Sequence, residues 1–176
     1  MEAVVVLLAI LVVGNLLLTW GMVRRLRSVQ EQVEGVFGPS ENGLGPGDEA
    51  PDFVGQTLNG DTVTRDSLLR SETVLAFFAP FCDACEAQLP AVRQLAGHPD
   101  GTPAVVAVIN GVAAESGHLI EGLRGEVQML FASRAHNDLL KNYQVNVYPS
   151  YYAIGSDGRI TGSYTNVNEI LASSHP

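Results

Sequence analysis

The sequence predicts one α/β domain whose mixed central β-sheet is flanked by helices. Runs of β-branched and aromatic residues of strand length alternate with segments of helical spacing, a pattern typical of this class. Two short extended runs near the end of the chain flank a turn-rich spacer, which predicts a closing antiparallel hairpin. The 176 residues provide one domain of ordinary size with a short appendage, and not two independent cores.

An apolar stretch precedes this domain. Residues 3–23 are almost wholly apolar, which is long enough for a helix that spans a bilayer. A cleaved signal peptide is the alternative, but such peptides begin with positive charge and end in a small-residue cleavage site. Here the chain begins with Met1-Glu2, and Arg24-Arg25 follow the apolar stretch. We therefore expect a retained, single transmembrane helix.

The composition divides the chain into three parts. Residues 1–26 are the expected transmembrane anchor. Residues 27–47 combine a polar juxtamembrane segment with a linker, because residues 38–47 hold too much glycine and proline for a helix or a central strand. Residues 48–176 form the expected globular domain.

The first half of the domain predicts a hairpin and then a strand-to-helix junction. Asn59-Gly60 between two extended runs is a strong turn signal, so we expect an N-terminal hairpin over residues 57–63. Residues 73–79 have the composition of a strand, and residues 83–95 have the apolar spacing of a helix. Both cysteines of the chain fall at this junction.

The second half of the domain alternates strands and helices. A continuous apolar run at residues 103–109 is typical of a central parallel strand. The elements expected after it are a helix over 113–123, a strand over 127–131, a helix over 135–143 and hairpin strands over 150–154 and 159–164.

The net charge of the chain limits the classes of partner that we expect. The net charge is -9 and clustered lysine and arginine are scarce, so nucleic acid is not an expected partner. A small thiol or a protein substrate fits this charge better. The two cysteines are too close in sequence to link distant parts of a fold. A disulfide between them would be local, so we expect it to serve chemistry rather than stability.

Cys82 and Cys85 are the candidate catalytic residues. Two thiols with this spacing at the start of a helix can close a disulfide within one turn. The amides and the dipole at a helix N-terminus favour the thiolate of Cys82, and a thiolate is the species that attacks a disulfide. Cys85 then resolves the mixed disulfide by attacking the Cys82 sulfur. This chemistry requires no cofactor.

Other roles exist for a cysteine pair of this spacing. Half of a zinc site looks the same, but zinc needs two more ligands, and the histidines are scattered without ligand spacing: His98, His118, His136 and His175. We therefore expect no metal site and treat each histidine as an ordinary surface or loop residue. Haem attachment requires a histidine directly after the second cysteine, where this chain has Glu86. Two buried, inert cysteines are the remaining alternative.

Further motifs are spread over residues 47–170. They are Ala50-Pro51-Asp52-Phe53, Phe77-Phe78-Ala79-Pro80-Phe81-Cys82-Asp83-Ala84-Cys85, Pro90, Val147-Tyr148-Pro149-Ser150 and Asp157-Gly158-Arg159-Ile160. Together they resemble the membrane-anchored thioredoxin-like proteins of the TlpA, ResA and MauD type, in the wider redoxin group. The resemblance implies a thioredoxin-like fold.

The resemblance also implies a substrate-binding loop. In this family the late proline is cis and faces the disulfide, which implies that Pro149 is cis and that Tyr148 offers backbone hydrogen bonds to a substrate chain. Cis peptide bonds are essentially confined to X-Pro bonds. A trans Pro149 that starts an edge strand is the alternative. Pro90 resembles the family's helix-kinking proline, and its alternative is an early end of the helix.

The chain departs from thioredoxin around the cysteines. Phe78 and Phe81 stand where thioredoxins usually have tryptophans. Ala76 stands where thioredoxin has a buried acid, and Gln88 stands where some anchored reductases have a glutamate. No general base for Cys85 is therefore evident.

Two acids lie close to the cysteines in the sequence. Glu86, in the first turn of the expected helix, is interpreted as a solvated charge that favours the helix N-terminus. Asp83 places negative charge beside the Cys82 thiolate, opposes the helix dipole and makes Cys82 less acidic. Weaker stabilisation of the thiolate favours the disulfide form, so we expect a moderately to strongly reducing couple.

The resemblance implies a membrane-tethered thiol-disulfide oxidoreductase that exchanges a Cys82-Cys85 dithiol or disulfide with protein substrates. We expect a reductase in extracytoplasmic protein maturation, served by a membrane or soluble thiol electron partner. A thiol peroxidase of the redoxin group is one alternative, but it usually needs a nearby threonine and an arginine, and Ala79-Pro80-Phe81 precedes Cys82. A non-enzymatic tethered module that binds a partner or a soft metal is the other.

Two signals disagree about the side of the membrane. Arg24, Arg25 and Arg27 follow the expected span and only Glu2 precedes it, so the positive-inside rule alone places the globular domain in the cytoplasm. The resemblance implies the opposite side. Because the charge rule has exceptions, we expect a single-pass protein of the cell membrane whose globular domain lies outside the cytoplasm.

Overall fold

A computed structural model of the protein describes residues 2, 6, 44–68, 71–97, 103–125, 127–132 and 138–173. The chain divides into two units, Met1–Gly38 and Pro39–Pro176, and the elements named below belong to the second. The predicted anchor, apart from Glu2 and Val6, lies outside the described residues, as does most of the predicted linker. The helices that the structure does describe include none long and apolar enough to cross a membrane.

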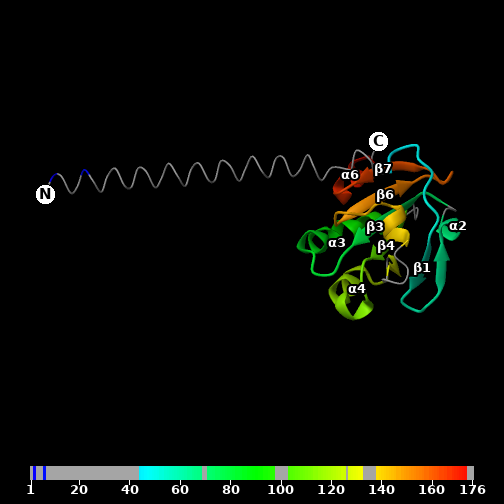
Figure 1. The fold of residues 1–176 in the computed structure, drawn as a ribbon, viewed down its shortest axis with the longest axis horizontal. Helices are drawn as coiled ribbons and strands as arrows, with labels where there is room; N and C mark the ends of the chain where they lie inside the picture. Colours follow the sequence, from blue (N-terminus) through cyan, green and yellow to red (C-terminus); the bar gives the residue numbers. More distant parts are fainter. Residues whose placement is uncertain are drawn as a thin grey trace. The chain divides into compact units, whose positions relative to one another are not determined.

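The described strands form one mixed sheet. They are β1 (Val54–Thr57), β2 (Thr62–Thr64), β3 (Thr73–Phe78), β4 (Ala104–Ile109), β5 (Gln128–Phe131), β6 (Ser150–Ile154) and β7 (Ile160–Tyr164). Their order across the sheet is β2-β1-β5-β4-β3-β6-β7 (Figure 1). β3, β4 and β5 run parallel, and the other neighbours pair antiparallel.

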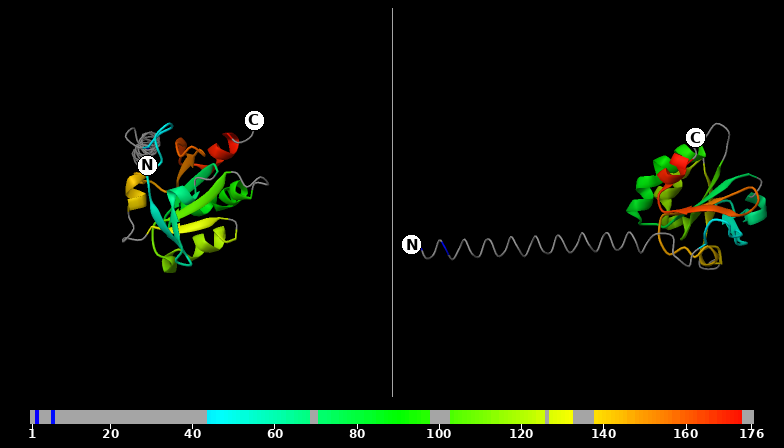
Figure 2. Two further views of the ribbon diagram at one scale, coloured as in Figure 1. Left: turned by 90° about the vertical axis from the view of Figure 1, so that its right-hand side faces the viewer. Right: turned by 90° about the horizontal axis from the view of Figure 1, so that it is seen from above.

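Helices cover both faces of this sheet. They are α2 (Arg65–Leu68), α3 (Asp83–Ala96), the 3-10 helix η1 (Ala113–Glu115), α4 (Gly117–Leu123), α5 (Asp138–Asn142) and α6 (Val167–Ser173). α3, α4 and α6 pack on one face and α5 on the other (Figure 2). The predicted α/β architecture, with a mixed sheet between helices, is confirmed.

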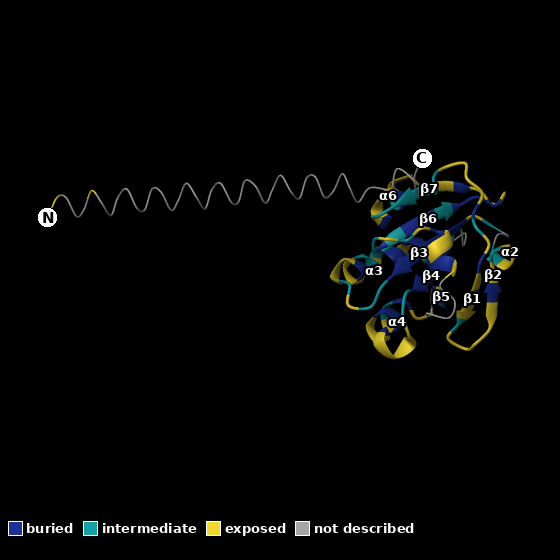
Figure 3. Ribbon diagram, in the orientation of Figure 1, coloured by how far each residue is buried: buried dark blue, intermediate teal, exposed yellow. Residues whose placement is uncertain are grey.

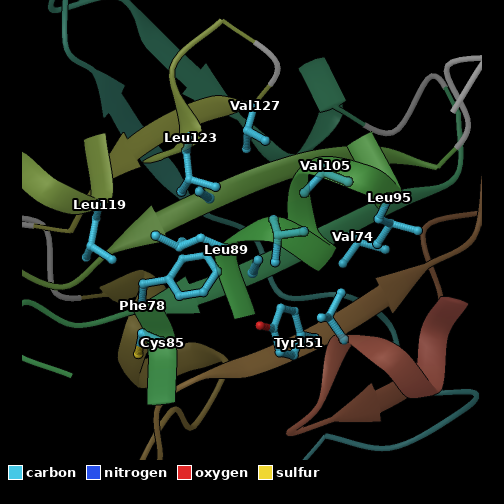
Figure 4. Close-up of a cluster of buried hydrophobic side chains, with 14 of the residues drawn as sticks. Val74, Phe78, Cys85, Leu89, Leu95, Val105, Leu119, Leu123, Val127 and Tyr151 are labelled. Atoms are coloured by element: carbon cyan, nitrogen blue, oxygen red, sulfur yellow. The ribbon is translucent and has the colours of Figure 1, made fainter. Parts of the chain in front are cut away.

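The strand β3 separates the two halves of the core. All of its residues are buried, because it has a neighbouring strand on each edge and helices over each face (Figure 3). Successive side chains of a strand point to opposite faces. Ala76 and Phe78 therefore join the cluster under α3, which also contains Cys85 (Figure 4), and Leu75 and Phe77 join the cluster under α5.

The predicted hairpins and the predicted strand-to-helix junction are confirmed. Asn59 and Gly60 lie in the turn between β1 and β2, where Gly60 adopts a φ of 86° that favours glycine. α3 continues through Pro90 to Ala96, so the alternative of an early helix end at this proline is wrong.

The predicted helix over residues 113–123 is interrupted. η1 and α4 are separated by Ser116, whose φ of -112° and ψ of 19° are not helical. The Ser116 hydroxyl donates to the Val112 carbonyl at 3.0 Å, a local bond that competes with a regular helix. The predicted helix over 135–143 is confirmed in its described part, α5. The short helices α2 and α6 have no counterpart in the sequence prediction.

Replacing Leu95 by alanine tests the assignment of the core. Leu95 is fully buried in α3, so truncation leaves a cavity and removes apolar contacts. The free energy of unfolding should fall by about 2–5 kcal/mol, measured by chemical denaturation of the oxidised protein. Gln94→Ala, at an exposed position on the same helix, is the control and should change this free energy by less than about 0.5 kcal/mol. Equal losses in the two variants would contradict the assignment.

Candidate active site

Cys82 and Cys85 lie where the chain passes from β3 into α3. Cys82 caps the N-terminus of α3, and Cys85 belongs to its first turn. The two residues form a disulfide, and their Cα atoms are 5.2 Å apart. The helix thus begins directly after the first cysteine, which brings the second sulfur back to it within one turn. The predicted cysteine pair is confirmed in its predicted place.

Backbone amides surround Cys82. The Cys85 N–H donates to the Cys82 Sγ at 3.1 Å, and the Glu86 N–H donates to the Cys82 carbonyl at 3.1 Å. The Cys85 N–H and the positive end of the helix dipole favour negative charge on the Cys82 sulfur, whereas the Glu86 N–H bond belongs to the first turn of the helix. After reduction of the disulfide, the geometry therefore suits Cys82 as the attacking thiolate.

The two sulfurs differ in their access to solvent. Cys85 is fully buried in the core, whereas Cys82 is only partly buried. Phe81, directly before Cys82, is 80% exposed and has a left-handed backbone with a φ of 60°. A partner can therefore reach Cys82 but not Cys85, and the exposed Phe81 is the residue next to Cys82 in the chain.

A loop distant in sequence lies beside the disulfide. The Tyr148-Pro149 peptide bond is cis, so the expectation from the resemblance is confirmed and the trans alternative is wrong. The carbonyl oxygen of Tyr148 lies 3.8 Å from the Cys82 Sγ. In the dithiol form the Cys82 thiol can donate to this carbonyl. The structure therefore brings Tyr148 and Pro149 to the cysteines, as predicted.

The ring of Tyr148 is held by a residue that the sequence did not single out. The side-chain amide of Asn110 donates to the Tyr148 hydroxyl at 2.9 Å. Burial raises the pKa of Tyr148, and the bond from Asn110 opposes part of this rise. Asn110 directly follows β4. A polar residue at the carboxyl end of a parallel strand is the one sequence signal that could have identified it.

Gln88 ties the helix that carries the cysteines to the far edge of the sheet. Its side-chain oxygen accepts from the Tyr151 hydroxyl at 3.0 Å and from the Val167 N–H at 2.8 Å. Its side-chain nitrogen donates to the Thr165 carbonyl at 3.2 Å. Burial raises the pKa of Tyr151, so that hydroxyl remains a donor at neutral pH. Gln88 is thus a neutral clamp between α3, β6 and α6, and it offers no base for Cys85.

Glu86 has a partner on the neighbouring helix. Its carboxylate lies 3.0 Å from Nε2 of His118 in α4, and both side chains are partly exposed. This contact fits the interpretation of Glu86 as a charge near the N-terminus of α3, and it also connects α3 to α4. Within the described part of the chain, no three histidine, cysteine or acidic side chains gather in a group that could hold a metal ion.

The sequence pattern of the AhpC/TSA family matches residues 46–163, a span that contains both cysteines and the cis-proline. The chain belongs to the AhpC/TSA family. This redoxin assignment agrees with the resemblance found in the motifs. With the disulfide at the strand-to-helix junction, it confirms the predicted class of enzyme, a thiol-disulfide oxidoreductase with a CxxC pair.

This AhpC/TSA-family chain is similar to a thioredoxin-like protein in sequence and to several solved structures in fold. The thioredoxin-like protein YneN of Bacillus subtilis is 26% identical over 125 residues, which are 70% of this chain and 74% of the relative. The thioredoxin domain of a thiol-disulfide oxidoreductase from Bacteroides vulgatus superposes with a TM-score of 0.67 at 16% identity, covering 74% of this chain and 96% of that one.

Two further solved structures are similar. The exposed lipoprotein thioredoxin Etrx1 of Streptococcus pneumoniae gives a TM-score of 0.58 at 22% identity, over 70% of this chain and 97% of that one. A secreted disulfide oxidoreductase of Mycobacterium tuberculosis gives 0.55 at 22% identity, over 68% and 92% of the two chains. These superpositions confirm the thioredoxin-like fold that the resemblance implied.

Replacing Gln88 by methionine tests its role as a clamp. The substitution keeps the length of the side chain but leaves the buried Tyr151 hydroxyl and the Val167 N–H without their acceptor. The free energy of unfolding should fall by about 1–3 kcal/mol in thermal or chemical denaturation. Gln94→Met, at an exposed position of the same helix, should leave it nearly unchanged. An unchanged Gln88→Met variant would show that the three hydrogen bonds do not stabilise the fold.

Proposed function

We propose that this AhpC/TSA-family chain reduces disulfide bonds of protein substrates through Cys82 and Cys85. One observation carries the proposal: the accessible Cys82 sulfur caps α3, is bonded to a buried partner and lies 3.8 Å from the Tyr148 carbonyl. This arrangement joins an attacking sulfur, a resolving sulfur and a backbone edge for a substrate chain. Inert structural cysteines would require none of the three.

The first step forms a mixed disulfide. The Cys82 thiolate attacks one sulfur of the substrate disulfide and forms a bond between Cys82 and that sulfur. The substrate disulfide breaks, and its other sulfur leaves as a thiolate that takes a proton from solvent. The N-terminal amides of α3 stabilise the Cys82 thiolate before it attacks.

The second step releases the reduced substrate. Cys85 attacks the Cys82 sulfur and forms the intramolecular disulfide, while the bond between Cys82 and the substrate breaks. The proton lost by the Cys85 thiol passes to the expelled substrate thiolate, directly or through solvent. Two electrons have then passed from the cysteine pair to the substrate. A thiol electron partner must return them by the same exchange in reverse before the next cycle.

The loop at Tyr148 and the ring of Phe81 are the proposed contacts for the substrate chain. The backbone of Tyr148 can pair with an extended segment that carries the substrate cysteine, because main-chain hydrogen bonds give affinity without requiring a particular sequence. Phe81, the residue before Cys82 in the chain, offers an exposed apolar surface. The cis-proline Pro149 keeps this backbone edge beside Cys82.

The negative charge next to Cys82 supports a reducing direction of electron flow. Asp83 is exposed at the start of α3, where its carboxylate opposes the stabilisation of the thiolate by the helix. A less stabilised thiolate gives up its electrons more readily. We therefore assign the pair a reducing role, supplied by a membrane or soluble thiol donor.

The proposed site of action is the outer side of the cell membrane. The apolar composition of residues 3–23 supports a single-pass anchor, and the glycine- and proline-rich composition of residues 38–47 supports a linker before the globular domain. Two structural neighbours are described as an exposed lipoprotein thioredoxin and a secreted disulfide oxidoreductase, which supports an extracytoplasmic domain. Protein maturation outside the cytoplasm is the role that fits this placement.

Replacing Cys85 by serine should trap the substrate. Without the resolving thiol, the mixed disulfide on Cys82 persists, so a covalent partner complex should accumulate and disappear on treatment with a thiol reductant. Non-reducing gel electrophoresis measures it. Cys82→Ser is the matched control and should form no complex. A tethered metal-binding module would form no complex in either variant, and oxidation by peroxide faster than disulfide exchange would favour a peroxidase instead.

Labelling of intact cells tests the side of the membrane. A membrane-impermeant maleimide should label the native protein either directly or after an impermeant reductant, because the cysteine pair is expected outside. Direct labelling would indicate a reduced pair, fed with electrons through the membrane. The Cys82→Ser, Cys85→Ser variant, which has no cysteine left, is the control. Labelling that requires lysis would place the domain in the cytoplasm and contradict the maturation role.

A further inference from the structure

Asn110, directly after β4, is hydrogen-bonded to the end of β3 and to the loop that precedes β6. Its backbone N–H donates to the Phe78 carbonyl at 2.8 Å, and its side-chain amide donates to the Tyr148 hydroxyl at 2.9 Å. Because β3 lies between β4 and β6, the second bond crosses the end of β3. It therefore spans the point at which the chain turns toward Cys82.

The position of Asn110 is itself fixed from two sides. Its backbone is bonded to the last residue of β3. A Cβ atom on the next residue, Gly111, would lie only 3.2 Å from the Pro80 ring, so this turn packs closely against the segment that leads to Cys82. The backbone of Asn110 is thus held in place, and its side chain reaches Tyr148 from this fixed position.

Tyr148 links Asn110 to the reacting sulfur. Its ring packs against both hydrophobic clusters, and its carbonyl oxygen lies 3.8 Å from the Cys82 Sγ. Burial raises the pKa of the phenol, so the hydroxyl stays protonated at neutral pH and can accept the bond from Asn110 while keeping its own proton. A constraint on the ring is therefore a constraint on the backbone edge beside the disulfide.

We propose that Asn110 is a positioning residue for substrate exchange. By holding the Tyr148 ring, it keeps the Tyr148 backbone where a substrate peptide can pair with it while the substrate disulfide meets Cys82. Asn110 does not touch the reacting atoms. This role rests on the proposed function, because it matters only for a substrate that has a peptide backbone.

The test uses variants of similar side-chain shape in the full-length chain. Asn110→Leu removes the donor, and Tyr148→Phe removes the acceptor without altering the ring. Asn110→Asp exchanges the donor for an acceptor to which the Tyr148 hydroxyl can donate, so it restores the bond in reverse. The steady-state constants are measured with dithiothreitol as the electron donor and corrected for its direct reaction. Insulin is the protein disulfide, and dithiodipyridine is a small disulfide without a backbone.

Asn110→Leu and Tyr148→Phe should each raise the KM for insulin about three- to tenfold with little change in kcat, as loss of one hydrogen bond predicts. The same variants should affect dithiodipyridine much less. The double variant should be no worse than either single one, because both remove the same bond. Asn110→Asp should return the KM for insulin to within about twofold of the native value.

Asn142→Leu is the matched control. The side-chain amide of Asn142 also donates a hydrogen bond, to the Asp52 carbonyl, but this bond lies away from the disulfide. It should leave both substrates unaffected. Three results would overturn the positioning role while leaving the reductase in place. They are equal effects on both substrates, additive increases of the KM for insulin in the double variant, or an Asn110→Asp variant whose KM for insulin is as high as that of Asn110→Leu. A native protein that turns over dithiodipyridine but not insulin would overturn the proposed function and the inference with it.

Discussion

The burial of β3 is the constraint on which the site depends. Neighbouring strands on both edges and helices over both faces leave this strand one register, and its last residues then fix three things at once. They direct the chain toward Cys82, they hold Asn110 through a backbone bond, and they place the segment before β6 beside both. The disulfide, Asn110 and the cis-proline loop therefore meet at the end of β3, although they come from segments that are distant in the sequence.

The elements that the sequence predicted are those with a strong local pattern. The apolar run of β3 and the helical spacing of α3 bracket Cys82, so its place at the junction followed from periodicity alone. The break at Ser116 and the bond from Asn110 to Tyr148 depend on side-chain contacts that no periodicity records. The cis state of Pro149 came from the family resemblance, because the local sequence of an X-Pro bond favours trans and does not by itself predict a cis bond.

Burial also separates the roles of the two cysteines. A thiolate is disfavoured where water is excluded, and Cys85 is fully buried among apolar residues. The neighbouring positions Ala76 and Gln88 carry no charge that could compensate, and the Gln88 side chain already uses both of its polar atoms. In the proposed mechanism Cys82 is therefore the attacking sulfur, and the buried Cys85 attacks only the mixed disulfide that forms on Cys82.

Two opposing influences act on the Cys82 sulfur, and their surroundings decide which prevails. The Cys85 amide is bonded to Sγ at 3.1 Å, whereas the Asp83 side chain is exposed and screened by water and salt. Unit charges 4 Å apart interact by about 4 kcal/mol near a protein surface but by only about 1 kcal/mol in bulk water. In the proposed mechanism the helix terminus therefore favours Cys82 as the attacking sulfur, and Asp83 opposes this effect only weakly. Because Asp83 is exposed, a substitution there can change the electrostatics of the site without disturbing the core.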